Sequence, residues 1–210
     1  MHLLLIRHGQ SVGNAARRIQ GRNHEPLTET GRAQALALAQ RLQSAYDICS
    51  VYSSSLLRAR QTAEIIADLL GLSVTFEDRL GEYDPGVVAG MNLEEVEAEY
   101  PEIARRWAED SWRVPIPGEE GSDVFQERVL SAMREIVASH REEDSVAVVA
   151  HGGTWSAYLA GLIGLDFRKR QPWVLDNGSL SIVIHGGVRP RIALLNDTCH
   201  LNHLQGRGLA

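Results

Sequence analysis

The chain has 210 residues and a formal net charge of −6, and 44% of its residues are hydrophobic while 23% are charged. A chain of this length is expected to form one domain whose core needs no disulfide or metal. The composition excludes disordered, collagen-like and coiled-coil proteins. The acidic balance argues against a protein that binds nucleic acid or a membrane surface.

The two cysteines, Cys49 and Cys199, belong to no CxxC motif. The sequence therefore predicts neither a disulfide framework nor a zinc ribbon, and two unpaired thiols favour a reducing compartment. The apolar run Leu3-Leu4-Leu5-Ile6 is too short for a signal-peptide core, and no stretch approaches the ~20 apolar residues of a spanning helix. We expect a cytoplasmic protein that binds no membrane.

Apolar runs and helical periodicity alternate along the chain. In order, the sequence predicts a strand at 3–6, a polar stretch at 8–26, a helix after the N-cap Thr28, a strand at 48–52, a helix from caps at Ser53–Ser55 to Gly71 and a strand at 74–76. Short helices at about 92–99 and 101–109 precede a Pro-rich loop at 115–118, a helix from Ser122 to about Arg141, a strand at 146–150, a helix to Gly164, and strands at about 179–185 and 190–195. This alternation predicts the α/β class, as a three-layer α/β/α sandwich with a mostly parallel sheet. With no repeat or linker, residues 1–210 are expected to be a single domain.

Two of the predicted strands end in a histidine followed by glycine. His8-Gly9 follows the first strand, and His151-Gly152-Gly153 follows the strand at 146–150. Ligands bind at the carboxyl ends of strands in open α/β sheets, and glycines and helix N-termini admit an anion there. One such pair alone is as readily a core or turn histidine, but the repeated context favours two histidines that face one crevice.

Two arginines strengthen the prediction of an anion site. Arg7 adjoins the first histidine, and Arg58 lies in the first turns of the helix after the second strand. The planar guanidinium fork matches a phosphate group. The alternative is a solvated arginine on the helix surface, which is the expected position of Arg60, although composition alone does not choose between the two.

The motifs around these residues resemble the histidine phosphatase superfamily, in its phosphoglycerate-mutase-like branch. Five blocks occur in the family's order along nearly the whole chain: Arg7-His8-Gly9 with Asn14 and Gln20-Gly21; residues 26–31 with Gln34-Ala35; residues 54–63; Leu80-Gly81-Glu82 with Gly86 and Gly90; and His151-Gly152-Gly153. Ser55 departs from the family pattern, in which aspartate is common.

The resemblance implies a metal-independent phosphomonoesterase that needs no cofactor and acts on a small-molecule phosphate ester. His8 would attack phosphorus and carry a phosphohistidine, while Arg7 and Arg58 would disfavour its imidazolium form. Glu82 would protonate the leaving alkoxide and then deprotonate water. The equatorial oxygens would be held by Arg7, Arg58, Asn14 and His151. Further phosphate or substrate contacts are expected from Ser11, Gln20, Gly21, Arg22, Tyr83 and Gly152, with His24 and Trp112 as additional candidates.

Two other motifs point to different chemistry. Residues 9–13, Gly-Gln-Ser-Val-Gly, satisfy the nucleophile-elbow pattern of serine hydrolases. Only eight residues precede that motif, too few for the upstream oxyanion loop, so Ser11 is expected to support the phosphate loop instead. Cys199 and His200 suggest metal ligands, but they lie on a C-terminal tail with no further cluster, so a docked or frayed tail is expected.

Three other activities stay open beside a general phosphatase. Cofactor-dependent mutases typically carry an insertion between the acid and the second histidine, whereas only 69 positions separate Glu82 from His151 here, which favours hydrolysis. Residues 176–179 and 196–201 resemble metal-independent phosphoserine phosphatases, but Pro85 stands where that branch has a histidine for the substrate carboxylate, and residues 118–122 depart from its Gly-Gly-Glu-Ser loop. A non-catalytic binder would lack the nucleophile, the acid or an arginine, and all are present. Dimers are common in this superfamily, so the resemblance leaves a homodimer open.

Overall fold

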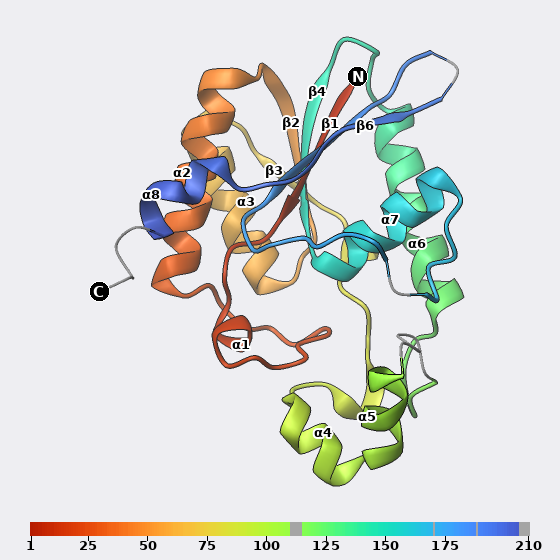
Figure 1. The fold of residues 1–210 in the computed structure, drawn as a ribbon. Helices are drawn as coiled ribbons and strands as arrows, with labels where there is room; N and C mark the ends of the chain where they lie inside the picture. Colours follow the sequence, from red (N-terminus) through yellow and green to blue (C-terminus); the bar gives the residue numbers. More distant parts are fainter. Residues whose placement is uncertain (110–114, 170, 188, 206–210) are drawn as a thin grey trace.

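The computed structural model describes residues 1–109, 115–169, 171–187 and 189–205. It contains a six-stranded sheet in the order β3-β2-β4-β1-β5-β6 (Figure 1). The strands are β1 (His2–Arg7), β2 (Ile48–Ser53), β3 (Val74–Phe76), β4 (Ser145–Ala150), β5 (Leu180–Ile184) and β6 (Arg191–Asp197). The pairs β1–β4, β2–β4 and β2–β3 are parallel, whereas β5 pairs antiparallel with both β1 and β6. The sheet is therefore mostly parallel, as predicted, with an antiparallel edge.

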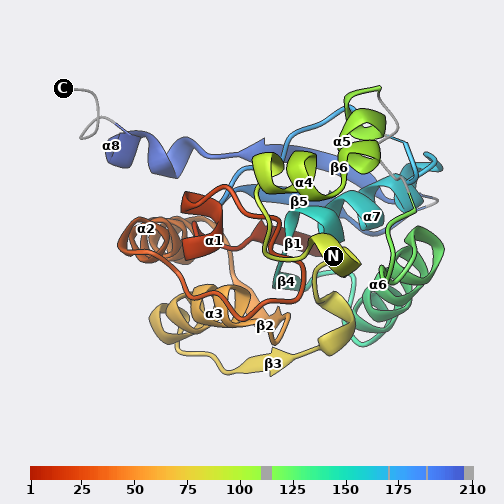
Figure 2. The same cartoon turned by 90° about the horizontal axis from the view of Figure 1, so that it is seen from below.

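Helices cover both faces of this sheet. The α-helices of the described residues are α1 (Val12–Ala15), α2 (Glu29–Ala45), α3 (Leu57–Leu70), α4 (Leu93–Glu99), α5 (Pro101–Ala108), α6 (Ser122–Ala138), α7 (Gly152–Ile163) and α8 (Asn202–Gln205). α2 and α3 cover one face, and α6 and α7 cover the other (Figure 2). Leu4 and Ile6 of β1 belong to the core on the α2–α3 side, while Leu3 and Leu5 belong to the core on the α6–α7 side. Because successive strand residues face opposite sides, a strand covered on both faces needs a continuous apolar run. The predicted α/β/α layers are confirmed.

Most of the predicted helix ends also agree with the structure. The Thr28 hydroxyl accepts a hydrogen bond from the Gly31 N–H at 3.0 Å and caps α2, and left-handed glycines end α3 and α7 at Gly71 and Gly164. The prediction of serine caps for α3 is wrong, because its N-cap is Leu56, which makes no side-chain capping bond. α6 ends at Ala138, earlier than predicted.

A small layer made of α4 and α5 lies beyond the carboxyl edge of the sheet (Figure 1). It has its own buried cluster of Val88, Val96, Ile103 and Ile116, separate from the two cores that flank the sheet. This layer places apolar side chains opposite the strand ends that carry the two histidines. Within the described ranges, no helix is long and apolar enough to cross a bilayer.

Candidate active site

A pocket of about 910 Å³ lies between the carboxyl edge of the sheet and the α4–α5 layer. Eight of the residues predicted from the sequence line it: Arg7, His8, Asn14, Gln20, Gly21, Arg58, Glu82 and Tyr83. The ring of His151 is fully buried behind the lining, and its centroid lies 5.1 Å from that of His8. The two predicted histidines therefore meet at this edge.

The hydrogen bonds of His8 define its tautomer. Arg58 Nε, which can only donate, lies 3.2 Å from His8 Nε2, so this ring nitrogen carries the lone pair. His8 Nδ1 then carries the proton and donates it to the carbonyl oxygen of Gly9 at 2.7 Å. Burial, together with the charges of Arg58 and Arg7, holds the pKa of His8 well below its ordinary value. His8 is thus a neutral imidazole with an unprotonated nitrogen at the pocket.

His151 is neutral for the same reasons. Burial is the main cause that lowers its pKa well below the ordinary value, and Arg58 and His8 add to the effect. Its Nε2 lies 2.8 Å from the hydroxyl of Ser54, while its Nδ1 is buried with no hydrogen-bond partner among the described residues. Ser54 was not predicted as a site residue, because its motif position gave only a helix cap.

The two arginines are held by the backbone around the pocket. Arg58 donates to the carbonyl oxygens of Asn23 at 2.7 Å and Gly21 at 2.8 Å. Burial lowers the pKa of Arg58 to about 10, so it stays charged at neutral pH. Arg7 donates to the carbonyl of Leu175, and its Nε is buried without a partner among the described residues. A buried unpaired N–H costs about 1–3 kcal/mol, so a polar ligand at this point is favourable.

Glu82 is held by two backbone N–H groups. Its Oε1 accepts from Tyr83 N at 2.8 Å and its Oε2 from Gly153 N at 3.0 Å. A Cβ atom at position 153 would lie 2.2 Å from Glu82 Oε1, so the second glycine after His151 makes room for the carboxylate. Gly153 lines the pocket and was not predicted, whereas the predicted Gly152 is outside the lining and packs beside Arg7.

Asn14 is oriented by its side-chain oxygen. Asn14 Oδ1 accepts from Ser11 N and from Asn177 Nδ2, each at 3.1 Å, while its side-chain nitrogen Nδ2 makes no hydrogen bond within the described part of the chain. Ser11 is buried and caps α1, and its hydroxyl lies 2.6 Å from Gln20 Oε1. Ser11 does not line the pocket, so its contacts fit the expected support of the loop rather than a serine nucleophile.

A further arginine, Arg128, holds the loop that carries Glu82. Arg128 of α6 donates to the carbonyl oxygens of Arg79 at 2.6 Å, Gly81 at 2.8 Å and Glu82 at 3.0 Å. Glu120 pairs with Arg128 at 2.8 Å and also accepts from the N–H of Asp84. The sequence gave no local signal for this contact, because Arg128 occupies an ordinary polar position of an amphipathic helix.

The remaining predicted residues lie elsewhere. Arg22 pairs with Glu120 at 3.3 Å, and neither Arg22 nor His24 lines the pocket. Trp112 falls outside the described residues. Asp197, Cys199 and His200 lie within 4.8 Å of one another, but Arg41 donates to Asp197 at 2.8 Å and places its own positive charge there.

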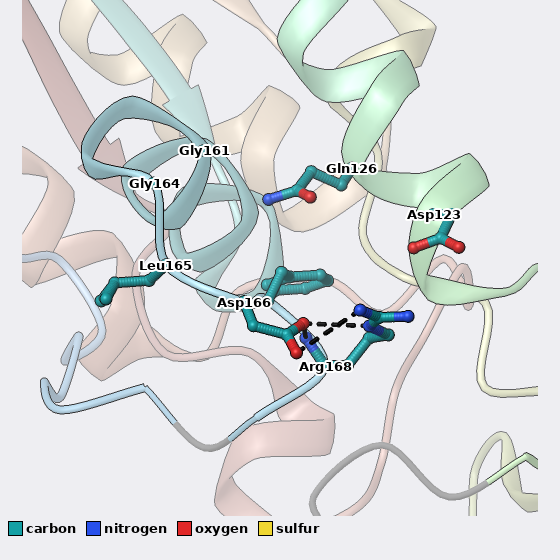
Figure 3. Close-up of a pocket in the computed structure, with 8 residues that line it drawn as sticks. Asp123, Gln126, Gly161, Gly164, Leu165, Asp166 and Arg168 are labelled. Carbon is teal, nitrogen blue, oxygen red and sulfur yellow. Dashed lines mark hydrogen bonds and ion pairs between the residues drawn. The ribbon is translucent and has the colours of Figure 1, made fainter.

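A smaller hollow of about 420 Å³ lies between α6 and the end of α7 (Figure 3). Asp166 and Arg168, which form an ion pair at 3.0 Å, contribute to its wall. None of the residues predicted to act on phosphate lines it, so the 910 Å³ pocket is the candidate site.

Comparisons with known proteins agree with the motifs. Residues 3–198 match the family model described as histidine phosphatase superfamily (branch 1). Phosphoserine phosphatase 1 of Hydrogenobacter thermophilus is 38% identical over 95% of this chain and 93% of that protein. The probable phosphoglycerate mutase GpmB of Erwinia tasmaniensis is 34% identical over 88% and 85% of the two chains. A mycobacterial glucosyl-3-phosphoglycerate phosphatase solved in complex with VO3 is 30% identical, with a TM-score of 0.82 over 93% of this chain and 98% of that chain.

Proposed function

Because the chain belongs to the histidine phosphatase superfamily, branch 1, we propose that it hydrolyses small phosphate monoesters through a phosphohistidine formed on His8. The observation that carries this proposal is the neutral His8, whose Nε2 lone pair meets a pocket that also holds Arg7, Arg58 and Glu82. Two of the three proteins compared above are named as phosphatases, which supports hydrolysis.

In the first half-reaction, the hydrogen bond from Arg58 Nε–H to His8 Nε2 breaks. The freed Nε2 lone pair attacks phosphorus while the bond from phosphorus to the alcohol oxygen breaks. Glu82 in its acid form gives its proton to the departing alkoxide. Nδ1–H of His8 keeps its hydrogen bond to Gly9 and holds the ring in position. In the second half-reaction, Glu82 takes a proton from water, the water oxygen bonds to phosphorus, and the Nε2–P bond breaks to release inorganic phosphate.

The donors around His8 supply the stabilisation that the transferred group needs. Arg7 Nε and Asn14 Nδ2, which have no hydrogen-bond partner in the described part of the chain, are placed to donate to phosphoryl oxygens. A Ser54 hydroxyl that donates to His151 Nε2 leaves the proton of His151 on Nδ1, which becomes a third donor. Fixed positive charge and oriented donors act most strongly in a site that excludes water. These groups are the reason to expect turnover without a metal.

The test is single-turnover labelling combined with chelation. Enzyme mixed with a ³²P-labelled aryl phosphate is expected to carry an acid-labile, base-stable label that His8→Ala lacks, and EDTA is expected to leave the steady-state rate unchanged. Retained turnover in His8→Ala, or its loss on chelation, would contradict the mechanism. The melting temperature of His8→Ala, compared with that of the wild type, shows that the variant is folded when its activity is measured.

The mutase alternative has its own readout. The probable mutase GpmB relatives make 3-phosphoglycerate the substrate to test. Release of inorganic phosphate from it supports the phosphatase, whereas isomerisation to 2-phosphoglycerate without release supports the mutase. We keep a cytoplasmic location as a prediction, supported by two exposed free cysteines at positions 49 and 199. A homodimer likewise stays a prediction.

A further inference from the structure

The pocket extends well beyond the groups that act on phosphate. Its far part, here called the outer chamber, is lined by Ile19, Leu93, Pro101, Ala104, Trp107 and Ile116. These side chains come from the α4–α5 layer and from the two segments that pack against it. Leu93 is 67% exposed although it is a large apolar residue. An apolar wall of this kind is suited to an apolar part of a ligand.

The arginines of the outer chamber are paired with carboxylates, and its other charged side chains are glutamates. Arg18 pairs with Glu95 at 2.9 Å. Arg105 forms ion pairs with two carboxylates of its own helix region. Glu97 and Glu119 also line the pocket. Among the described lining residues, Arg7 and Arg58 at the phosphate end are the arginines without a carboxylate partner, so a carboxylate on the alcohol would meet little free positive charge and two negative groups.

The volume points in the same direction. At about 910 Å³ the pocket is near the upper end of the ~300–1,000 Å³ range that encloses drug-sized ligands. A three-carbon ester bound at His8 would leave the outer chamber in contact with water rather than substrate. Pro85, which lines the pocket beside Gly21, extends the apolar wall toward the phosphate end and offers no N–H donor.

We propose that the outer chamber binds the alcohol portion of the substrate and selects phosphate monoesters of bulky, largely apolar alcohols over three-carbon esters that carry a carboxylate. The inference rests on the proposed function, because only a phosphoryl group at His8 directs the alcohol into the outer chamber. Phosphoserine, suggested by the name of one relative, is the competing substrate.

The experiment uses primary alkyl phosphates whose alcohols have similar acidity, so that the chemical step is equally demanding. Ethyl, hexyl and 3-phenylpropyl phosphate are compared with O-phosphoserine and 3-phosphoglycerate. Each buried methylene is worth about a fourfold gain in kcat/KM. We expect kcat/KM to rise at least about tenfold from ethyl to hexyl phosphate and to be lowest for the carboxylated esters. Preference for phosphoserine or 3-phosphoglycerate overturns the inference.

A pair of variants ties any preference to the outer chamber. Ala104→Phe places a ring in the outer chamber and is expected to lower the ratio of kcat/KM for 3-phenylpropyl to ethyl phosphate at least about fivefold. Ala98→Phe adds the same ring on the exposed face of α4, outside the pocket lining, and is expected to keep the wild-type ratio. Equal ratios in the two variants would count against the outer chamber.

The outcomes also separate this inference from the proposed function. If His8 is labelled and the enzyme turns over all esters without preferring larger alcohols, only the proposed role of the outer chamber is overturned. Absence of turnover on every ester, with no label on His8, overturns both. The melting temperatures of Ala104→Phe and Ala98→Phe show whether a loss of activity comes from misfolding. The ratio of kcat/KM for two substrates of one variant does not depend on the fraction of active protein.

Discussion

Burial and charge act together on His8, and they set the chemistry of a single ring nitrogen. An exposed histidine would be partly protonated near neutral pH. Here the surrounding protein and two guanidinium groups favour the neutral ring, and the hydrogen bond to Gly9 decides that the lone pair stays on Nε2. In the proposed mechanism, the arginines that would bind the phosphate therefore also keep His8 unprotonated before the substrate arrives.

Gly153→Ala tests how closely Glu82 must be placed. The new Cβ would lie 2.2 Å from Glu82 Oε1, so the carboxylate has to move and loses the hydrogen bond from the backbone N–H at 153. We expect kcat for an alkyl phosphate to fall about 10²-fold, the lower end for loss of a general acid. The decrease should be smaller for p-nitrophenyl phosphate, whose leaving group needs no proton. An equal loss on both esters would show that Glu82 is not the acid.

At the level of secondary structure, α6 helps to position Glu82, the proposed general acid, although no residue of α6 lines the pocket. Arg128 projects from α6 and binds three carbonyl oxygens of the loop between β3 and α4, and Glu120 holds the same guanidinium in place. A loop held at three carbonyls has few alternative conformations. We therefore regard Arg128 as a positioning residue for Glu82.

Arg128→Met removes these hydrogen bonds while keeping an unbranched side chain over Phe125. We expect a 10- to 100-fold lower kcat on alkyl phosphates, a smaller loss on p-nitrophenyl phosphate, and little change in KM, because the donors proposed for the phosphoryl oxygens, Arg7, Asn14 and His151, lie outside this loop. Arg134→Met is the matched control, since Arg134 lies on the same helix in a surface pair with Glu127. If both variants behave alike, Arg128 has only a structural role.

The elements that sequence could predict are those fixed by local patterns. Continuous apolar runs located β1 and β4, and Thr28, Gly71 and Gly164 marked helix ends correctly. The helix α1 was not predicted, because its four residues make only about one turn and show no helical periodicity. Composition alone could not separate Arg58 from Arg60, and the family resemblance identified Arg58. The packed fold buries Arg58 and leaves Arg60 paired with Glu64 at the surface. Ser54 and Arg128 were missed because their partners are distant in the chain.

At the scale of the whole molecule, the net charge of −6 and the anion pocket occupy different places. Exposed carboxylates such as Glu135 and Glu109 pair with arginines at the surface, whereas Arg7 and Arg58 line one cavity. A single-domain organisation stays a prediction. The family match at residues 3–198 includes every residue assigned a role in the proposed mechanism.

The two buried histidines predict how stability depends on pH. Their pKa values are lowered in the folded state, so below about pH 6.5 the unfolded chain binds more protons than the folded one. These two groups therefore make the free energy of unfolding fall as pH decreases below 6.5, with a slope that approaches about 1.4 kcal/mol per pH unit for each histidine that stays neutral in the fold. His151→Asn is expected to reduce the loss of stability between pH 6.5 and 5.5 by about 1 kcal/mol, because the unfolded histidine is only half protonated at pH 6.5. Removal of the exposed His24 by His24→Asn is expected to leave the slope unchanged. Urea unfolding at pH 7.5, 6.5 and 5.5 measures the slopes, and an unchanged slope in His151→Asn would mean that His151 is not held neutral in the folded protein.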